Sequence, residues 1–256
     1  MARYLVLMGS GENSPAMVTP HQNIIKSLEK DSKKSLLDTS FGFQENADEL
    51  TGKIQKYFEV NVGHKTNEIK LRNKEDISDE VIKEISSSKW IFSGPGSPTY
   101  TLKIWQDEKI LNALKTVLDQ GAIVLASAAA MSVGAKVMPV YEMYKVGEDP
   151  YWVDGLNLLE HATGIKAAVV AHYNNTQGGT HDTRFCFIGE RRMRNLESLL
   201  DSETGILGID EHTGISFNLE TNTAEVFGKG VVTFKKAGSE KIFTPKETIN
   251  TTAFLS

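Results

Sequence analysis

The stretch DEKILNALKTVLDQGAIVLASAAAMSVGA, residues 107–135, decides the fold. Apolar residues at helical spacing fill its first half, and Asp107 and Gly121 are residue types suited to begin and end that helix. The run AIVLA at 122–126 has the continuous apolar character of a parallel strand that is buried on both faces. Ser127 and a series of small residues follow at once. The stretch therefore predicts a helix, a buried strand and a tight turn into a second helix.

The same alternation of strand and helix runs through the rest of the chain. Short runs from GILGID at 205–210 to EKIFTP at 240–245 predict antiparallel hairpins at the edge of the same sheet. Strands that alternate with helices require right-handed crossovers and a parallel sheet. We therefore expect one α/β domain, residues 1–256: a three-layer α/β/α sandwich with a mostly parallel central sheet and antiparallel C-terminal edge hairpins. The other expected strands are Tyr4–Met8, Ser35–Ser40, Glu68–Leu71, Trp90–Ser93 and Lys166–Tyr173.

Composition restricts the class of protein. The 256 residues are 40% hydrophobic, with 28 basic against 33 acidic side chains, and no basic stripe favours a nucleic-acid partner. The apolar run near the start is too short for a signal peptide, and no stretch is long enough for a membrane span. Cys186 is the single cysteine, so neither an internal disulfide nor a thiolate metal cluster is expected. These features predict a cytoplasmic protein with no nucleic-acid partner and no membrane span.

Three turns with glycine or serine follow expected strands, at 9–11, 94–96 and 127–129. Ligands of open α/β sheets bind at the carboxyl ends of strands, where these turns lie. The first turn does not complete a dinucleotide fingerprint, because Ser14 stands at the third glycine position. No Gly-Lys-Ser/Thr sequence indicates a phosphate-binding loop either.

Ser127 is the best-placed nucleophile. A serine between a buried strand and a helix of small residues has the sequence form of a nucleophile elbow, in which a sharp turn lifts the hydroxyl clear of the sheet. The backbone amide of Ala128 would then face the developing oxyanion. Two alternatives stay open. Ser127 is also a suitable helix cap, and Ser132, more than a helical turn further on, is a second candidate nucleophile.

A serine nucleophile needs a base, and His172 is the expected one. It ends the apolar strand KAAVVAHY, so it repeats the position of Ser127 and is expected at the same edge of the sheet. His181 lies in a polar loop and His212 in GIDEHTG. The remaining histidines fit structural or solvated roles: His21, His64 and His161.

Together these segments resemble the aspartyl dipeptidase (peptidase E) and cyanophycinase group of serine peptidases. That group has a fold similar to class I glutamine amidotransferases, with serine in place of the cysteine nucleophile. The resemblance follows one order along the chain, from about Met1 to Phe234. The segments that carry it are Phe92–Ser97, Ser127–Ala130, His172–Tyr173, Gly178–Arg184 and Gly208–Glu211.

The resemblance implies a function and roles for particular residues. It implies a Ser127-His172-Glu142 triad that cleaves a short Asp-containing peptide or amide through an acyl-enzyme, with no cofactor or metal; Glu148, Asp149 and Asp154 are nearby substitutes for Glu142. Arg184 would grip the acidic side chain of the substrate with two parallel hydrogen bonds. The Gly96 and Ala128 amides would form the oxyanion hole, and related enzymes are often homodimers. The other implied substrate-binding residues are Ser97, Tyr173, Asp210 and Glu211.

Two other functions stay open. Leu125 and Ala129 stand where glycines usually flank the nucleophile, and Pro95 has no N–H to offer an oxyanion. A ligand-binding relative without catalysis is therefore one alternative. The other is a metal-dependent hydrolase, although no HExxH or comparable local spacing supports it. The side chains available for such a site are His172, His181, Asp182, Asp210, Glu211 and His212.

Overall fold

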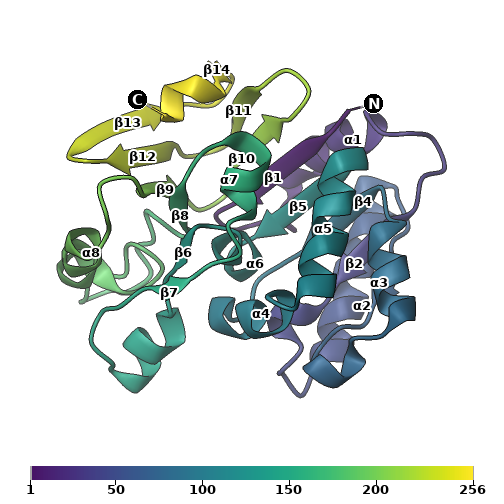
Figure 1. The fold of residues 1–256 in the computed structure, drawn as a ribbon, viewed down its shortest axis with the longest axis horizontal. Helices are drawn as coiled ribbons and strands as arrows, with labels where there is room; N and C mark the ends of the chain where they lie inside the picture. The colour runs from purple at the N-terminus through teal and green to yellow at the C-terminus, as the bar shows by residue number, and fades with distance from the viewer. Residues whose placement is uncertain (1, 256) are drawn as a thin grey trace.

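The computed structural model describes residues 2–255, whose strands form two larger β-sheets and one short strand pair (Figure 1). The larger sheet has eight strands in the order β14-β11-β10-β1-β5-β4-β2-β3. Its parallel strands are β1 (Tyr4–Met8), β2 (Lys34–Leu37), β3 (Asn67–Ile69), β4 (Trp90–Ser93) and β5 (Ala122–Ala126). The antiparallel strands are β10 (Thr213–Asn218), β11 (Thr223–Gly228) and β14 (Thr248–Asn250).

The smaller sheet has four strands in the order β13-β12-β9-β8. Within it β8 runs parallel to β9, and the other two pairings are antiparallel. A separate short pair joins β6 (Lys136–Val137) to β7 (Val153–Asp154). The strands of the smaller sheet are β8 (Ala167–Val170), β9 (Gly205–Ile209), β12 (Val232–Lys236) and β13 (Ser239–Phe243).

Helices cover both faces of the larger sheet because alternate strand residues are apolar toward each side. One face packs on α1 (Val18–Lys26) and α2 (Ala47–Tyr57), around Phe58 and Phe92. The opposite face packs on α3 (Asp79–Ser86), α4 (Pro98–Trp105) and α5 (Glu108–Gln120). The remaining helices are α6 (Ala128–Ser132), α7 (Leu158–Thr163) and α8 (Gly189–Ser198). No helix within residues 2–255 is long and apolar enough to cross a bilayer.

The expected three-layer α/β architecture is confirmed, and β4 and β5 have the predicted bounds. The hairpins differ from the prediction of a single sheet. The β10–β11 hairpin extends the larger sheet beside β1, whereas β12–β13 joins the smaller sheet with β8 and β9. The strand that precedes His172 therefore lies outside the central sheet. Pairing partners depend on long-range contacts, which the local apolar pattern does not specify.

The two sheets share one hydrophobic core. Its largest cluster includes Leu5 and Leu125 of the central sheet together with Leu207, Ile209 and Phe234 of the smaller one. Close packing of this kind fixes the relative position of both sheets, because an interior at crystal-like density leaves little room for sliding. The carboxyl ends of β5, β8 and β9 are thereby held next to one another.

Candidate active site

Ser127 occupies a sharp turn between β5 and α6. Its backbone has φ 50° and ψ −115°, a conformation that is rare for a residue with a side chain. The Ser127 N–H donates to the Met8 carbonyl at 2.9 Å, which extends the β1–β5 pairing to the turn itself. Three buried alanines follow, at 128–130, and their small side chains let the helix start close to the strand. The turn is held from both sides in a strained conformation.

The two residues that replace the usual glycines fit this turn. Leu125 is buried in the core that faces α5, and Ala129 is buried in the same cluster. Leu125 pairs with Leu7 of β1 and with Ser93 of β4, so its backbone stays regular up to the turn. The leucine therefore has room, and the strained geometry falls on Ser127 alone.

His172 approaches Ser127 from the smaller sheet. It follows β8, and its own φ of 48° turns the backbone so that the imidazole reaches across the seam between the sheets. The Ser127 Oγ and His172 Nε2 atoms are 3.0 Å apart. This is hydrogen-bonding distance for a hydroxyl and an imidazole nitrogen. The two residues singled out from the sequence are thus brought together.

The other imidazole nitrogen contacts Glu211. His172 Nδ1 lies 3.0 Å from Glu211 Oε1, and the Asn175 side-chain amide donates to the same oxygen at 2.7 Å. Burial alone would raise the pKa of Glu211, but the hydrogen bonds from His172 and Asn175 outweigh burial and lower it. The parallel pairing of Val170 with Gly208 explains the contact, because it brings the ends of β8 and β9 to one edge.

The carboxylate beside His172 is therefore not Glu142, which the resemblance implied. Glu142 starts the short π-helical segment η5 (Glu142–Val146), and its Oε1 accepts a hydrogen bond from the Thr99 hydroxyl at 2.8 Å. Thr99 belongs to the first turn of α4, so Glu142 connects η5 to that helix. The position of Glu142 in the sequence, after the Ser127 helix, does not show that its side chain turns toward α4. For Glu211, the resemblance implied a role in substrate binding instead.

Two backbone amides lie beside Ser127 without a hydrogen-bond partner among residues 2–255, those of Gly96 and Ala128. Gly96 has φ 151°, and a Cβ atom at this position would lie 1.8 Å from the Ser40 carbonyl oxygen. Only glycine fits there. The Ser97 N–H donates to the same Ser40 carbonyl at 2.9 Å, which fixes the loop next to the end of β2.

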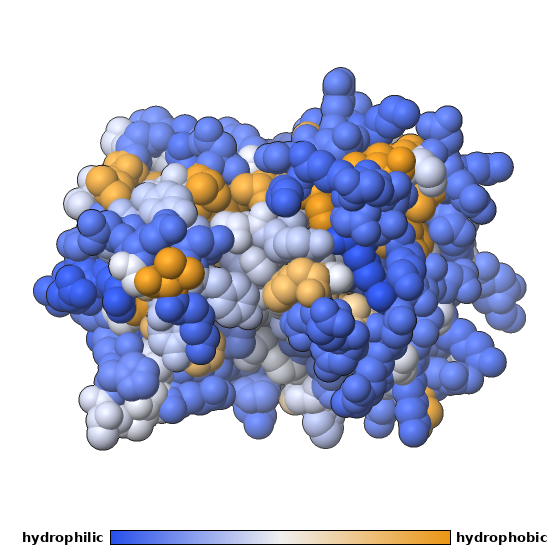
Figure 2. Space-filling model, turned by 90° about the horizontal axis from the view of Figure 1, so that it is seen from below, coloured by the Kyte–Doolittle hydropathy of each residue, from blue (hydrophilic) through white to orange (hydrophobic). Residues whose placement is uncertain are grey.

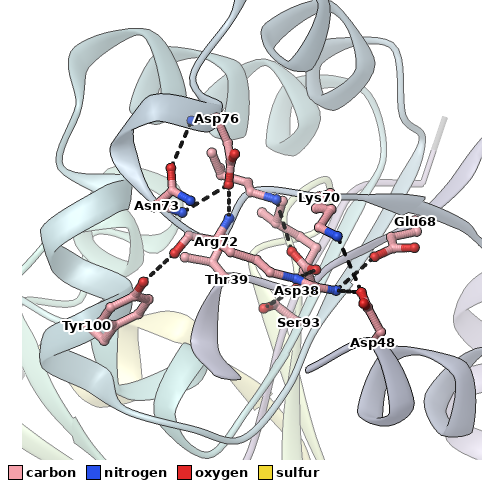
Figure 3. A network of polar contacts seen from close by, with 12 residues as sticks. Asp38, Thr39, Asp48, Glu68, Lys70, Arg72, Asn73, Asp76, Ser93 and Tyr100 are labelled. Atoms are coloured by element: carbon pink, nitrogen blue, oxygen red, sulfur yellow. Dashed lines mark hydrogen bonds and ion pairs between the residues drawn. The ribbon is translucent and has the colours of Figure 1, made fainter. Parts of the chain in front are cut away.

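An ion-pair network around the buried Asp38 carboxylate lies at the ends of β2 and β3 (Figure 3). The Asp38 carboxylate, which has no exposed surface, pairs with the Arg72 guanidinium and accepts the Leu71 N–H. The Tyr100 hydroxyl donates to the Arg72 carbonyl, which links the network to α4. Removing one partner of a buried pair leaves an uncompensated charge, so such networks hold their elements firmly. The ends of β2 and β3 and the start of α4 are thus fixed together.

Comparisons with known proteins identify the family. A sequence model described as peptidase family S51 matches residues 5–224. The chain belongs to peptidase family S51. It is accordingly a serine-type peptidase.

Two solved structures share the fold of this S51 peptidase. A crystal structure of a peptidase from an acI-B1 Actinobacterium superimposes with a TM-score of 0.79 at 20% identity, over 98% of this chain and 97% of that one. A putative peptidase E protein from Listeria monocytogenes EGD-e gives a TM-score of 0.57 at 14% identity, over 96% of this chain and 100% of that one. No curated protein matches the sequence significantly.

Arg184 of this S51 peptidase is engaged by acidic neighbours. Its guanidinium donates to both carboxylate oxygens of Asp182, at 3.0 and 2.9 Å, and pairs with Glu190 at 2.8 Å. Hydrogen bonds from Arg184 hold the pKa of Asp182 well below its usual range. Arg184 does not line the cavity beside Ser127. The two hydrogen bonds expected for a substrate carboxylate are made within the chain.

The other residues implied to bind substrate also point elsewhere. Tyr173 packs its ring over Gly208, and its hydroxyl is buried on the side of Lys235, where burial raises its pKa to about 12. The Asp210 carboxylate accepts the Val231 N–H at 2.9 Å and so fixes the start of β12. The Ser97 hydroxyl caps α4 by accepting the Tyr100 N–H. These three contacts are structural.

The alternatives to Ser127 in this S51 peptidase, namely a cysteine nucleophile, Ser132 and a metal site, have less geometric support. Burial raises the pKa of the Cys186 thiol to about 12, so the thiolate needed for a cysteine nucleophile is disfavoured. The Ser132 hydroxyl is buried and donates to the Ala129 carbonyl. No three His, Cys, Asp or Glu side chains between residues 2 and 255 gather into a group that could hold a metal ion. The contacts of Glu211 and Asn175 were not anticipated, although both residues follow apolar strands.

Proposed function

We propose that this serine peptidase cleaves short peptides or related amides through a Ser127-His172-Glu211 triad. The observation that carries the proposal is the pair of contacts around one imidazole. Ser127 Oγ lies 3.0 Å from Nε2, and Glu211 Oε1 lies 3.0 Å from Nδ1. A nucleophile, a base and a group that orients the base, each within hydrogen-bonding reach of the next, form the arrangement that activates a serine hydroxyl.

In the acylation step, Ser127 Oγ bonds to the carbonyl carbon of the substrate while its proton passes to His172 Nε2. The Glu211 carboxylate keeps the proton of the imidazole on Nδ1 and stabilises the imidazolium that forms. The Ala128 and Gly96 N–H groups donate to the oxyanion of the tetrahedral intermediate. When that intermediate collapses, the carbon–nitrogen bond breaks and the imidazolium protonates the leaving amine.

Deacylation repeats these movements with water. His172 takes a proton from the water molecule, whose oxygen attacks the acyl carbon. The bond to Ser127 Oγ then breaks, and the imidazolium returns the proton to that oxygen. The carboxylic acid product leaves and the enzyme is restored. Strain at Ser127 supports this role because residues held in sparsely populated backbone regions cluster at active sites and cost about 1–3 kcal/mol each. We propose on this basis that the turn is a nucleophile elbow.

The Asp-containing substrate implied by the resemblance has weaker geometric support. Arg184 would have to leave both Asp182 and Glu190 to bind a substrate carboxylate with its guanidinium. The side chain is nevertheless 45% exposed, so Asp-containing dipeptides belong in the first substrate panel.

Hydrolysis of a dipeptide panel tests the proposal. Products are quantified by liquid chromatography and mass spectrometry for the wild type, Ser127→Ala and Ser132→Ala, with and without a chelator. We expect turnover by the wild type and Ser132→Ala, none by Ser127→Ala, and no effect of the chelator. Specific binding of peptides without hydrolysis would instead indicate a ligand-binding relative. Loss of turnover on chelation would indicate a metal-dependent hydrolase.

A further inference from the structure

Ser127 and His172 open into a cavity of about 320 Å³ whose wall is mainly apolar. A cavity of this size holds one amino-acid side chain with part of its backbone. On the face that includes α4, seen from below in Figure 2, residues of intermediate and high hydropathy lie across the middle between hydrophilic margins. The apolar residues that line the cavity are Pro95, Pro98, Ala128, Met131, Val140, Cys186 and Phe187.

An unusual backbone turn builds one wall of this cavity. Phe185, Cys186 and Phe187 are three consecutive non-glycine residues with φ between 56° and 72°. Left-handed backbone at a residue with a Cβ atom costs about 1–2 kcal/mol, so a run of three persists only where surrounding contacts hold it. The Cys186 N–H donates to the His172 carbonyl at 3.2 Å, which ties the turn to the base. The Phe187 ring is thereby placed 5.8 Å from the His172 ring.

A single lysine adds charge to this cavity. Lys145 lies on η5, and its Nζ sits 4.6 Å from the centre of the Tyr144 ring, which itself packs on Phe187. Lys145 is the only residue of the cavity lining with an amine or guanidinium side chain. Within residues 2–255 it has no ion-pair partner at salt-bridge distance. Its side chain is exposed and reaches solvent at the edge of the cavity.

From these observations we infer that the cavity receives a bulky apolar side chain flanking the scissile bond, and that Lys145 binds the terminal carboxylate of the same short peptide. The inference rests on the proposed function, since it places substrate beside Ser127. An apolar wall favours an aliphatic or aromatic side chain and penalises a buried carboxylate without a partner. One exposed ammonium suits a free chain end, which also remains partly in solvent.

Binding of dipeptides to Ser127→Ala measures this preference without turnover, by isothermal titration calorimetry. The probes are Phe-Ala, Ala-Phe, Leu-Ala, Ala-Leu, Asp-Ala, Ala-Asp and Ala-Ala. We expect Phe and Leu, at one of the two positions, to bind about 10- to 100-fold more tightly than Asp or Ala there. Tightest binding of an Asp dipeptide, equal binding of the whole panel, or no binding at all would overturn the inference.

Two valines provide a matched pair of variants in the Ser127→Ala background. Val140 lines the cavity, whereas Val146 is 72% exposed and does not. Val140→Asp is expected to abolish the preference for Phe and Leu, and Val146→Asp is expected to leave it unchanged. If Val140→Asp fails to fold in a thermal unfolding control, the isosteric Val140→Thr takes its place with a smaller loss. A preference that survives the Val140 variants would contradict the assignment of this cavity.

Lys145→Met tests the carboxylate contact, with Lys103→Met on the exposed side of α4 as its control. Lys145→Met should weaken binding of the best dipeptide about three- to fivefold, while binding of its C-terminal amide stays the same. Lys103→Met should change neither. Equal losses for acid and amide, or no loss for either, would exclude this role of Lys145.

The result also separates the inference from the proposed function. Hydrolysis by the wild type with a preference for Asp would keep the function and overturn the apolar pocket. The predicted binding pattern without hydrolysis by the wild type would keep the pocket and overturn the peptidase mechanism.

Discussion

The central sheet and the smaller sheet contribute different parts of the proposed catalytic triad. Ser127 follows β5 in the middle of the central sheet, where neighbouring parallel strands and small helical residues fix its position locally. His172 and Glu211 follow β8 and β9 of the smaller sheet. The Oγ–Nε2 contact therefore spans the seam between the two sheets. The position of the proposed nucleophile depends on one turn, whereas its contact with His172 depends on how two sheets pack together.

This difference gives the two regions different sensitivities. A substitution at the turn changes the nucleophile itself. A substitution in the smaller sheet acts through the orientation of one imidazole, because Glu211 contacts His172 Nδ1 and Asn175 donates to the same Glu211 oxygen. Variants on the two sides of the seam should therefore lose activity to different degrees and in different ways.

Ser127→Ala, on the central-sheet side, should have the largest effect. Removing the nucleophile of a triad leaves only binding and oxyanion stabilisation, so kcat should fall by at least about 10⁴-fold. Ser132→Ala is the matched control, since that hydroxyl is buried and bonded to Ala129. Steady-state kinetics on the best dipeptide measure both. Equal losses in the two variants, or substantial turnover by Ser127→Ala, would show that the nucleophile lies elsewhere.

Glu211→Gln, on the other side of the seam, should cause the second-largest loss of kcat. An amide at this position no longer stabilises the imidazolium or holds the required tautomer, and kcat should fall about 10²- to 10⁴-fold with KM little changed. Glu142→Gln should lose far less, because Glu142 contacts Thr99 and not His172. The kcat values of the two variants decide between the carboxylates. A larger loss for Glu142→Gln would restore the acid that the sequence resemblance implied.

Gly96→Ala tests whether the loop that carries the proposed oxyanion donor Gly96 N–H depends on its contact with Ser40, after β2. The added methyl group would lie 1.8 Å from the Ser40 carbonyl oxygen, so the loop must move and its N–H with it. Loss of one oxyanion donor lowers kcat about 10²- to 10³-fold. Gly52→Ala in α2 meets nothing within 4 Å and should keep full activity, with a gain in stability of about 0.5–1 kcal/mol. Kinetics and thermal unfolding of both variants separate displacement of the loop from general damage.

The smallest effect should be a pH dependence of stability that arises in α1, which packs on the central sheet. His21 is fully buried with Nε2 3.0 Å from the Glu12 carbonyl, and burial lowers its pKa from 6.5 to about 4. The unfolded chain then binds the proton more readily, so this stabilisation is complete above pH 6.5 and is lost as the pH falls toward 4. Between pH 7 and pH 5 the free energy of unfolding should decrease by about 2 kcal/mol from this group.

Urea denaturation at the two pH values measures the contribution of His21. His21→Gln should remove most of the decrease, and His161→Gln, at an exposed position, should leave it in place. An unchanged pH dependence in His21→Gln would assign the acid sensitivity to other groups.

The sequence predicted the central sheet better than the seam. AIVLA and WIFS carry continuous apolar runs, and β5 and β4 begin and end where these runs do. Ser127 could be singled out from the sequence because a strand, a serine and small residues are contiguous there. His172 was expected at the edge of the same sheet, but β8 pairs with β9 in the smaller sheet. This pairing depends on contacts between residues that are far apart in the chain.

The carboxylate that contacts His172 could not be chosen from the local sequence pattern. Glu142 and Glu211 both follow apolar residues, and only the parallel register of Val170 with Gly208 brings Glu211 to the imidazole. The partners of Arg184 could not be predicted from the sequence either. Its partners Asp182 and Glu190 are close in sequence, yet nothing in the spacing shows that both carboxylates turn toward the guanidinium. Side-chain direction in such loops depends on backbone turns that propensity does not encode, such as the left-handed run at 185–187.

The rate of labelling by a fluorophosphonate, followed by mass spectrometry of the intact protein, tests most directly whether Ser127 is activated across the seam. We predict a single adduct on the wild type, none on Ser127→Ala, labelling at least about tenfold slower in Glu211→Gln, and an unchanged rate in Glu142→Gln. Labelling of Ser127→Ala at the wild-type rate would contradict the account. So would a Glu211→Gln variant that reacts as fast as the wild type.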